Sequence, residues 1–260
     1  MIPSETEALG VLESGLGSGR AAMILAAGRG ERMGSLTRRR PKPLLEVGGR
    51  TLIEHQIQRL RRAGYHQLVV NLGYLGHLIE LRLGDGAAYG VHIRYTREGD
   101  DILGTGGGVR NALSWLGDGP ILVVNADIWT RFPYASLGRC PRAGAHLVLV
   151  PNPPHHLEGD FALDPPRVRP AGSGPTATFS GIGLYDPWLF AGMPGGPFPL
   201  IAALEEAMIA GRVTGELFEG KWVDVGTPAR LSRLDLELLA GSETTGFPGK
   251  RLANQPARFM

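Results

Sequence analysis

The sequence predicts an α/β fold with a mostly parallel, mixed sheet and helices on both faces. Apolar runs of strand length recur at residues 21–26, 67–72, 91–95 and 121–125. Segments with the 3.6-residue periodicity of helices lie between them, at residues 51–63, 75–83 and 106–116. Because strands that alternate with helices pair in parallel and are covered on both faces, we expect a Rossmann-like sheet.

The helix expected at residues 51–63 has the clearest local signals. Ile53, Ile57 and Leu60 share one face, which predicts burial against the sheet. Thr51 and Glu54 have the spacing of a capping box, and Gly64 is a typical helix stop. The start and the end of this helix are therefore predicted as well as its buried face.

The pattern changes after about residue 130. Residues 145–150 and 176–185 predict strands, and the Pro-, Gly- and His-rich segment between them predicts loops or a hairpin. Helices are expected at residues 199–210 and 228–239, the second beginning with Thr227 as cap and Pro228 at its first position. Without a linker, residues 21–240 form one expected domain, between a flexible leader (1–20) and a flexible tail (241–260).

Composition narrows the classes of function. The chain has 260 residues, 43% of them hydrophobic, and a formal net charge of +2. This small charge does not indicate a nucleic-acid surface, and the sequence has no apolar run long enough for a membrane span. Cys140 is the single cysteine, which fits a reducing cytoplasm. We expect a cytoplasmic protein that acts on small molecules as a monomer or small homo-oligomer.

A glycine-rich loop at residues 25–33 follows the first strand, where open parallel sheets bind ligands. Gly28 and Gly30 allow backbone N–H groups to approach phosphate oxygens, and Arg29 and Arg32 add positive charge. A dinucleotide fingerprint needs glycine where Met33 stands, and a Walker A loop needs Gly-Lys-Ser/Thr. An ordinary surface turn is the other interpretation. The attached strand and Arg32 favour a triphosphate site.

Three further charged residues fit such a site. Lys42 lies between Pro41 and Pro43, which restrict the backbone and so the direction of the lysine. Asp127 ends an apolar strand, and Asp224 lies in a short apolar run far downstream. Mg²⁺ prefers one or two protein carboxylates together with phosphate oxygens, so the two aspartates would suit it if they converge. Turn-capping is the alternative for both aspartates, and a solvated loop lysine is the alternative for Lys42.

Residues 25–33, read with Pro-Lys-Pro-Leu-Leu at 41–45, resemble the signature of the sugar nucleotidyltransferase family. The resemblance runs from about residue 21 to 239. It implies a fold of the nucleotide-diphospho-sugar transferase type, similar to GT-A, and Mg²⁺-dependent transfer of a nucleotidyl group to a sugar 1-phosphate with release of pyrophosphate. The implied catalytic residues are Arg32 and Lys42, and the implied metal ligands are Asp127 and Asp224. The implied nucleotide contacts are Ala26, Ala27, Gly28, Arg29, Gly30, Glu98 and Gly104.

The second half resembles a narrower subgroup of this family, the uridylyltransferases that use N-acetylmuramate 1-phosphate in peptidoglycan recycling. The segments that carry this resemblance are residues 124–130, 146–156, 159–161, 179–182 and 222–227. It implies UTP as the donor and a sugar pocket with Asn125, Asp160, Ser180 and Gly181. One departure is Gly104, where the subgroup has glutamate; Leu-Gly-Thr is commoner in relatives that use other sugars or bases.

Several alternatives stay open at this point. A mannose or hexose 1-phosphate guanylyl- or uridylyltransferase is the second choice within the family. A non-catalytic sugar-nucleotide-binding module would be expected to lose Arg32, Lys42 or the aspartates, which are all present. A glycosyltransferase on a similar sheet would need Asp-x-Asp where this chain has Asn125-Ala126-Asp127. His155 and His156 are adjacent and lack further ligands at the spacing of a zinc site.

Overall fold

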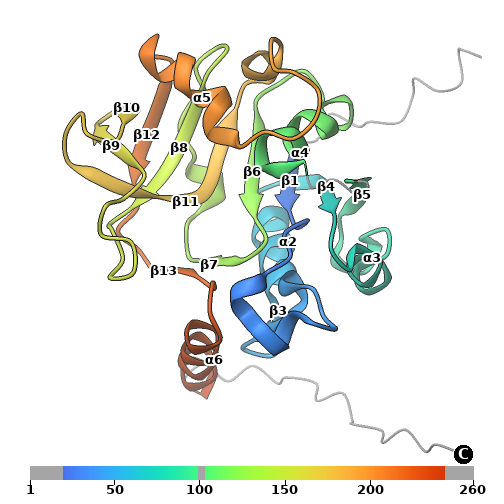
Figure 1. Ribbon diagram of the computed structural model, residues 1–260. Coiled ribbons are helices and arrows are strands. Elements are labelled where there is room, and N and C mark those ends of the chain that lie inside the picture. Colours follow the sequence, from blue (N-terminus) through green and yellow to red (C-terminus); the bar gives the residue numbers. More distant parts are fainter. Residues whose placement is uncertain (1–19, 99–102, 244–260) are drawn as a thin grey trace, which may run out of the picture.

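The computed structural model describes residues 20–98 and 103–243. In these ranges the main sheet has nine strands in the order β5-β4-β1-β6-β11-β8-β12-β10-β9 (Figure 1). The strands are β1 Arg20–Leu25, β4 Tyr65–Leu72, β5 His92–Arg97, β6 Ile121–Asn125, β8 Ala145–Val150, β9 Phe161–Asp164, β10 Arg167–Pro170, β11 Thr176–Tyr185 and β12 Val213–Leu217. The α-helices are α2 Leu52–Arg62, α3 Gly76–Leu83, α4 Gly104–Ala112, α5 Leu200–Ile209 and α6 Pro228–Glu243.

The sheet is parallel in its first half and mixed in its second. Strand β1 pairs in parallel with β4 and β6, and β4 pairs in parallel with β5. Strand β11 then runs antiparallel to both β6 and β8, whereas β12 is parallel to β8. The predicted α/β class with a mixed, mostly parallel sheet is therefore confirmed. The segment between β8 and β11 contains the hairpin β9–β10, one of the two structures expected there.

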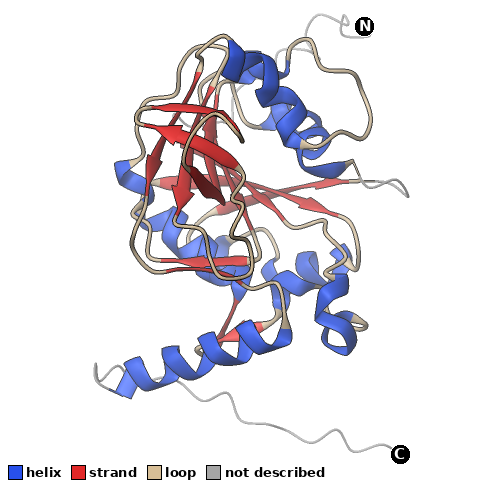
Figure 2. Cartoon of the chain, turned by 60° about the vertical axis from the view of Figure 1, so that its left-hand side comes forward, coloured by secondary structure: helices blue, strands red, loops and turns tan. Residues whose placement is uncertain are grey.

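Helices cover both faces of the sheet (Figure 2). Ile24 of β1 packs with Ile53 and Ile57 of α2 and with Ile79 of α3 in one core cluster. Its neighbour Met23 points to the other face and packs with residues of α4 and α5. Successive residues of a strand point to opposite faces, so an unbroken apolar run is what a doubly covered strand needs.

Two small ribbons lie at one end of the sheet. Strands β2 Glu46–Val47 and β3 Arg50–Thr51 form one, and β7 Ile128–Thr130 and β13 Trp222–Asp224 form the other. Leu234 of α6 packs with Val47 and Trp129, one from each ribbon, in a third core cluster. The C-terminal helix thus connects the two ribbons.

The 3₁₀ helices are η1 Glu31–Thr37, η2 Lys42–Leu44, η3 Ala87–Tyr89, η4 Leu113–Trp115, η5 Tyr134–Ser136 and η6 Pro187–Phe190.

Four of the five expected helix starts lie within one residue of those in the structure, and one differs. Thr51 and Glu54 form the reciprocal capping box, and Thr227 Oγ1 accepts a hydrogen bond of 3.3 Å from the N–H of Arg230. Helix α4 begins at Gly104, two residues before its expected start, because the glycines pack against the backbone of the segment before α5. Helix α6 continues to Glu243, beyond the expected end at 239.

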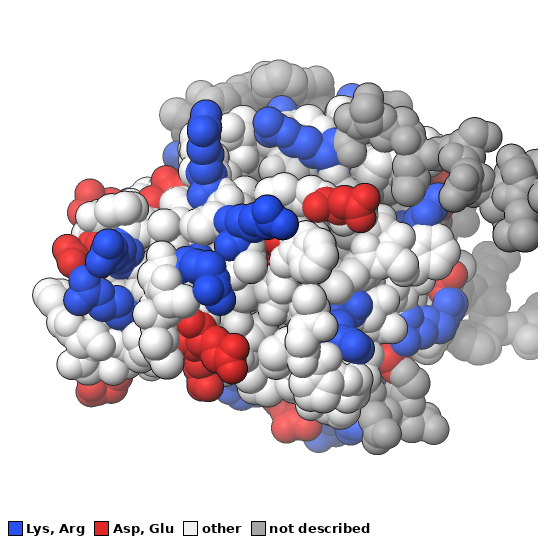
Figure 3. All heavy atoms as spheres, turned by 90° about the horizontal axis from the view of Figure 1, so that it is seen from above, with Lys and Arg blue, Asp and Glu red and all other residues white. Residues whose placement is uncertain are grey.

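The expected leader lies outside the described residues except for Arg20, and so does the tail from residue 244 onward. On the face drawn in Figure 3, the described Lys and Arg side chains are interspersed with Asp and Glu rather than gathered in one patch. None of the helices in residues 20–98 and 103–243 has the length and apolar character that crossing a bilayer requires.

Candidate active site

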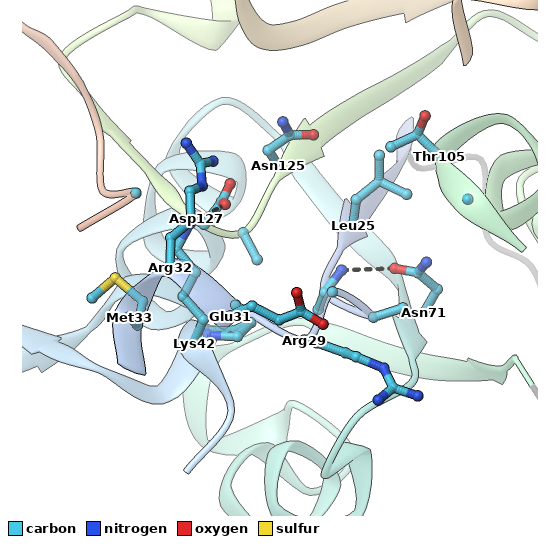
Figure 4. A pocket seen from close by; sticks show the side chains of 18 of the residues that line it. Leu25, Arg29, Glu31, Arg32, Met33, Lys42, Asn71, Thr105, Asn125 and Asp127 are labelled. Atoms are coloured by element: carbon cyan, nitrogen blue, oxygen red, sulfur yellow. Dashed lines mark hydrogen bonds and ion pairs between the residues drawn. The ribbon is translucent and has the colours of Figure 1, made fainter. Parts of the chain in front are cut away.

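A cavity of about 510 Å³ opens at the carboxyl ends of β1, β4 and β6 (Figure 4). Open α/β sheets bind ligands at this edge, where the strand order reverses. The predicted site residues that line the cavity are Ala26, Ala27, Gly28, Arg29, Gly30, Arg32, Lys42, Glu98, Gly104, Asn125 and Asp127. The sheet therefore brings together residues from three separate stretches of the chain.

The loop after β1 is fixed on one side and open on the other. The Ala26 N–H donates a hydrogen bond of 2.7 Å to Asn71 Oδ1 at the end of β4. Gly30 has a φ of 65°, and a Cβ there would lie 3.0 Å from Cβ of Lys42. At Gly28, in contrast, no atom of the described residues other than Gly28 itself and its chain neighbours lies within 4 Å of the position of a Cβ. The open backbone at Gly28 suits close approach by a phosphate.

The two arginines of this loop point in different directions. Arg32 extends toward Asp127, whereas Arg29 extends away from it (Figure 4). Both side chains are exposed. Of the two guanidinium groups, that of Arg32 is therefore the one placed to contact a ligand lying beside Asp127.

Lys42 is held in the wall of the cavity. It begins η2, is 6% exposed, and is flanked by Pro41 in an extended conformation and by Pro43. Its Nζ donates to Asp127 Oδ2 in an ion pair. The restricted lysine inferred from the two prolines is thus found, and the ammonium group faces a carboxylate at the end of β6.

Asp127 and Asp224 are brought to adjacent positions by the ribbon β7–β13. Asp224 is opposite Ile128 in this ribbon, and the Val225 N–H donates a hydrogen bond of 3.0 Å to the carbonyl oxygen of Asp127. The Asp127 side chain is 35% exposed and that of Asp224 24%. In the described ranges no group of three or more His, Cys, Asp or Glu could hold a metal alone. Two part-exposed carboxylates fit a Mg²⁺ ion that takes its other oxygens from phosphate and water.

Glu98, expected to contact the base, lines the cavity and is also held by hydrogen bonds within the protein. It is 5% exposed, and its Oε1 accepts 2.5 Å from Nδ2 of Asn71. Its Oε2 accepts 2.9 Å from the N–H of Leu103, just before α4. Since Asn71 also accepts from Ala26, a chain of hydrogen bonds joins the phosphate loop to the start of α4. Both carboxylate oxygens of Glu98 take part in these hydrogen bonds, so Glu98 mainly fixes the positions of the segments that line the cavity.

The glycine run at the start of α4 has a steric origin. Gly104 has a φ of +68°, and a Cβ there would lie 2.9 Å from the carbonyl oxygen of Phe198. A Cβ on Gly108 would lie 2.8 Å from Glu98 Oε1. Residue 104, at which this chain differs from the narrower subgroup, therefore has a backbone conformation that glycine adopts without strain.

The four expected sugar contacts fall into two groups. Asn125 lines the cavity, and Gly181, with a φ of +79°, packs so closely that a Cβ would lie 2.7 Å from Nδ2 of Asn125. Ser180 is completely buried and donates 2.6 Å to the carbonyl oxygen of Val148, so its hydroxyl does not line the pocket as expected.

Asp160 is not among the residues that line the cavity either. Its carboxylate accepts 2.7 Å from the N–H of Phe179 and contacts His156 at 3.0 Å. These contacts hold the loop before β9 against β11. The difference from the expected sugar contact arises because the sequence shows a carboxylate but not its partner across the sheet.

Sequence reasoning missed several residues of the site. Asn71 is the last residue but one of β4, and Asn125 is the last residue of β6. A polar residue at the end of an apolar strand was the signal that could have identified Asn71. Arg230 donates 2.9 Å to Asp224 Oδ2 and also contacts Nε2 of His155. Burial and the charge of Arg230 lower the pKa of His155, and Arg32 contributes in the same direction. The two histidines are thus separated: His156 pairs with Asp160, and His155 lies beside Asp224.

A glycine-rich loop, a buried lysine and two adjacent aspartates thus lie together near the carboxyl edge of the α/β sheet. The family model for nucleotidyl transferases matches residues 21–156, and the chain belongs to this family.

Two relatives are similar over most of their length. The N-acetylmuramate alpha-1-phosphate uridylyltransferase of Neisseria meningitidis serogroup B is 45% identical over 85% of this chain and 98% of its own. The protein of the same name from Caulobacter vibrioides is 35% identical over 80% of this chain and 93% of its own. A Bacillus anthracis protein crystallised in complex with a sucrose has the same fold, with a TM-score of 0.73, 19% identity, and coverage of 89% of this chain and 97% of that one.

Proposed function

We propose that this chain transfers a uridylyl group from UTP to N-acetylmuramate 1-phosphate and releases pyrophosphate. The observation that carries the reaction class is the cavity in which the phosphate loop, Lys42 and Asp127 meet. Support for the two substrates comes from the 45% and 35% identity to relatives that bear this name, over nearly their full length.

The proposed reaction needs no covalent bond between the protein and a substrate. A phosphate oxygen of the acceptor forms a bond to the α-phosphorus of UTP, and the bond from that phosphorus to the β-phosphate oxygen breaks as pyrophosphate leaves. The second pKa of a phosphate monoester is about 6, so the acceptor is mostly ionised at neutral pH and needs no general base. Catalysis then depends on positioning and charge neutralisation, as in other phosphoryl transfers.

Each proposed role follows from a position in the cavity. The open backbone around Gly28 would donate to the triphosphate, and Arg32 would neutralise part of its charge. Lys42 would face the same phosphates from the wall, beside Asp127. Asp127 and Asp224 would hold Mg²⁺, which when bound would offset the negative charge that builds up on the phosphates. Gly104 and Thr105, at the other end of the cavity, are proposed to lie next to the base.

The substrates also suggest where the enzyme works. The product, a uridine diphosphate derivative of N-acetylmuramic acid, would return a recovered cell-wall sugar to synthesis, so we place the reaction in peptidoglycan recycling. Because UTP is a cytoplasmic metabolite, the cytoplasm is the proposed location, with the enzyme acting as a monomer or small homo-oligomer.

A pyrophosphate-release assay tests this proposal. The purified chain is given each of the four nucleoside triphosphates with N-acetylmuramate, N-acetylglucosamine, glucose or mannose 1-phosphate, in Mg²⁺. We expect the fastest release with UTP and N-acetylmuramate 1-phosphate. Faster release with GTP and mannose 1-phosphate would transfer the assignment to the guanylyltransferases of the family, and no release with any pair would refute the enzymatic proposal.

A further inference from the structure

Arg230 lies at the side of the cavity where β13 leads into α6. Its backbone is fixed in the first turn of α6 by the hydrogen bond of 3.3 Å to Thr227 Oγ1. Its side chain is 20% exposed, and Nη1 donates 2.9 Å to Asp224 Oδ2 and contacts Nε2 of His155. The guanidinium group is thus held in one place by two partners.

The other edge of this guanidinium is available to a ligand. Both contacts are made by Nη1, and among the described residues Nε and Nη2 have no hydrogen-bond partner. The N–H groups of Nε and Nη2 form one edge that matches the two oxygens of a carboxylate or phosphate. A fixed arginine with a free edge is well suited to bind an anion, because little side-chain freedom remains to be lost.

The guanidinium lies next to a residue of the cavity wall. Arg230 is not itself a lining residue, but Gly226 is, and Nη2 of Arg230 occupies the position where a Cβ would project from Gly226. The same position lies 3.0 Å from Asp224 Oδ2. Glycine at residue 226 therefore lets the arginine lie against the wall of the site.

The two aspartates lie side by side among three cations. Nη1 of Arg230 donates to Asp224, Nζ of Lys42 donates to Asp127, and the Arg32 side chain extends toward Asp127 (Figure 4). Three cations thus face two carboxylates, and an anionic ligand would balance the remaining charge.

We propose that Arg230 binds an anionic group of the acceptor sugar phosphate. This inference rests on the proposed function, and it concerns an arginine on α6, outside the phosphate loop. N-Acetylmuramate 1-phosphate carries two anions, the 1-phosphate and the carboxylate of its lactyl ether. Either can take the edge formed by Nε and Nη2, and N-acetylglucosamine 1-phosphate, which lacks the carboxylate, distinguishes them.

The test compares Arg230→Met and Arg230→Lys with the wild type, using UTP and each of the two acceptors. Loss of a charge-assisted pair predicts a rise of roughly 10- to 100-fold in the acceptor KM of Arg230→Met, with the UTP KM within about twofold of wild type. Arg230→Lys keeps the positive charge but not the paired N–H groups of the guanidinium, so its acceptor KM should lie between those of the wild type and Arg230→Met. A rise in KM for N-acetylmuramate 1-phosphate alone means that Arg230 binds the carboxylate. An equal rise in KM for both acceptors means that it binds the phosphate.

Arg233→Met is the matched control, because Arg233 is one turn further along α6, is 84% exposed and pairs only with Glu237 among the described residues. An unchanged acceptor KM in Arg230→Met would overturn the inference. So would a loss of kcat alone that is restored by more Mg²⁺, because that result means that Arg230 only positions Asp224. Calorimetric titration with N-acetylmuramate 1-phosphate, without UTP, gives a readout independent of turnover. An inactive wild type would contradict the proposed function, whereas an active wild type with an unaffected Arg230→Met contradicts only this inference.

Discussion

Arg29 and Arg32 differ in what they can do for a bound triphosphate. They belong to one loop and are both exposed, yet Arg32 points toward Asp127 and Arg29 points away (Figure 4). The family resemblance implies a catalytic role for Arg32 and a nucleotide contact for Arg29. From the direction of each side chain, we expect the guanidinium of Arg32 to contact the triphosphate and Arg29 to contribute through its backbone.

Replacing each arginine separately tests this assignment. Arg32→Ala should raise the KM for UTP by roughly 10- to 100-fold, the effect of losing a hydrogen bond between charged groups. Arg29→Ala should change it by no more than about threefold, because only a long-range charge is lost. Steady-state kinetics with saturating acceptor measures both. Equal effects of the two substitutions would show that direction toward Asp127 is not what matters.

At single positions, the sequence predicts a residue's type of chemistry better than its partner. Lys42 and Asp127 meet in the cavity, and prolines and a strand end limit where they can lie. Glu98 and Ser180 were expected to contact ligands. Glu98 lines the cavity but also bonds to Asn71, whereas Ser180 is buried and bonds to the Val148 carbonyl. These partners lie on other strands, and sheet register is not visible in a local pattern.

At the scale of elements, Glu54 joins three segments of the first half of the fold. It completes the capping box of α2 with Thr51 and accepts from Arg82 of α3 at 2.8 Å and from Tyr89 of η3 at 2.8 Å. Burial by itself would raise the pKa of Glu54, but the hydrogen bonds from Thr51 and Tyr89 and the charge of Arg82 outweigh it and lower the pKa below its ordinary value of 4.5.

This shift predicts a pH-dependent contribution to stability. Because the folded-state pKa of Glu54 is below its unfolded value, the contribution is present above about pH 4.5 and is lost as the pH falls through the folded-state pKa. Glu54→Gln should lower the free energy of unfolding by about 1–3 kcal/mol at pH 7, and the difference from wild type should shrink at pH 3.5.

Urea unfolding at the two pH values measures the effect of Glu54→Gln. Glu80→Gln is the control, since Glu80 pairs with Arg97 at a more exposed site and should change stability by less than about 1 kcal/mol. A difference between Glu54→Gln and wild type that is equal at both pH values would contradict the proposed charge network.

Elements of the first half were predictable because each carries its own signal. The strand 67–72 and the helix 51–63 appear as β4 and α2 with nearly the expected bounds. The ribbon β7–β13 was not predictable, since its two strands of three residues are too short for a periodic pattern. That ribbon is what places Asp224 beside Asp127, so the sequence alone supports convergence of the two aspartates only as a hypothesis.

At the scale of the whole molecule, the site is assembled from both ends of the described chain. The phosphate loop and Lys42 come from the first quarter, whereas Asp224 and Arg230 come from β13 and α6 near its end. Helix α6 ties these parts together: Asp235 accepts 2.7 Å from the N–H of Gly48, and Leu234 packs on Val47 and Trp129 (Figure 1). The fold thus brings the loop after β1, Lys42 and Asp127 together around one cavity, and the ribbon β7–β13 places Asp224 next to Asp127.

We propose that this cavity performs metal-dependent nucleotidyl transfer through Asp127. Pyrophosphate release from UTP and N-acetylmuramate 1-phosphate in Mg²⁺, measured for wild type and Asp127→Asn side by side, tests this role of Asp127. We predict rapid release by the wild type and a rate at least about 100-fold lower for the variant, with similar thermal unfolding of both proteins. Near-normal release by a folded Asp127→Asn would contradict metal-dependent transfer through Asp127.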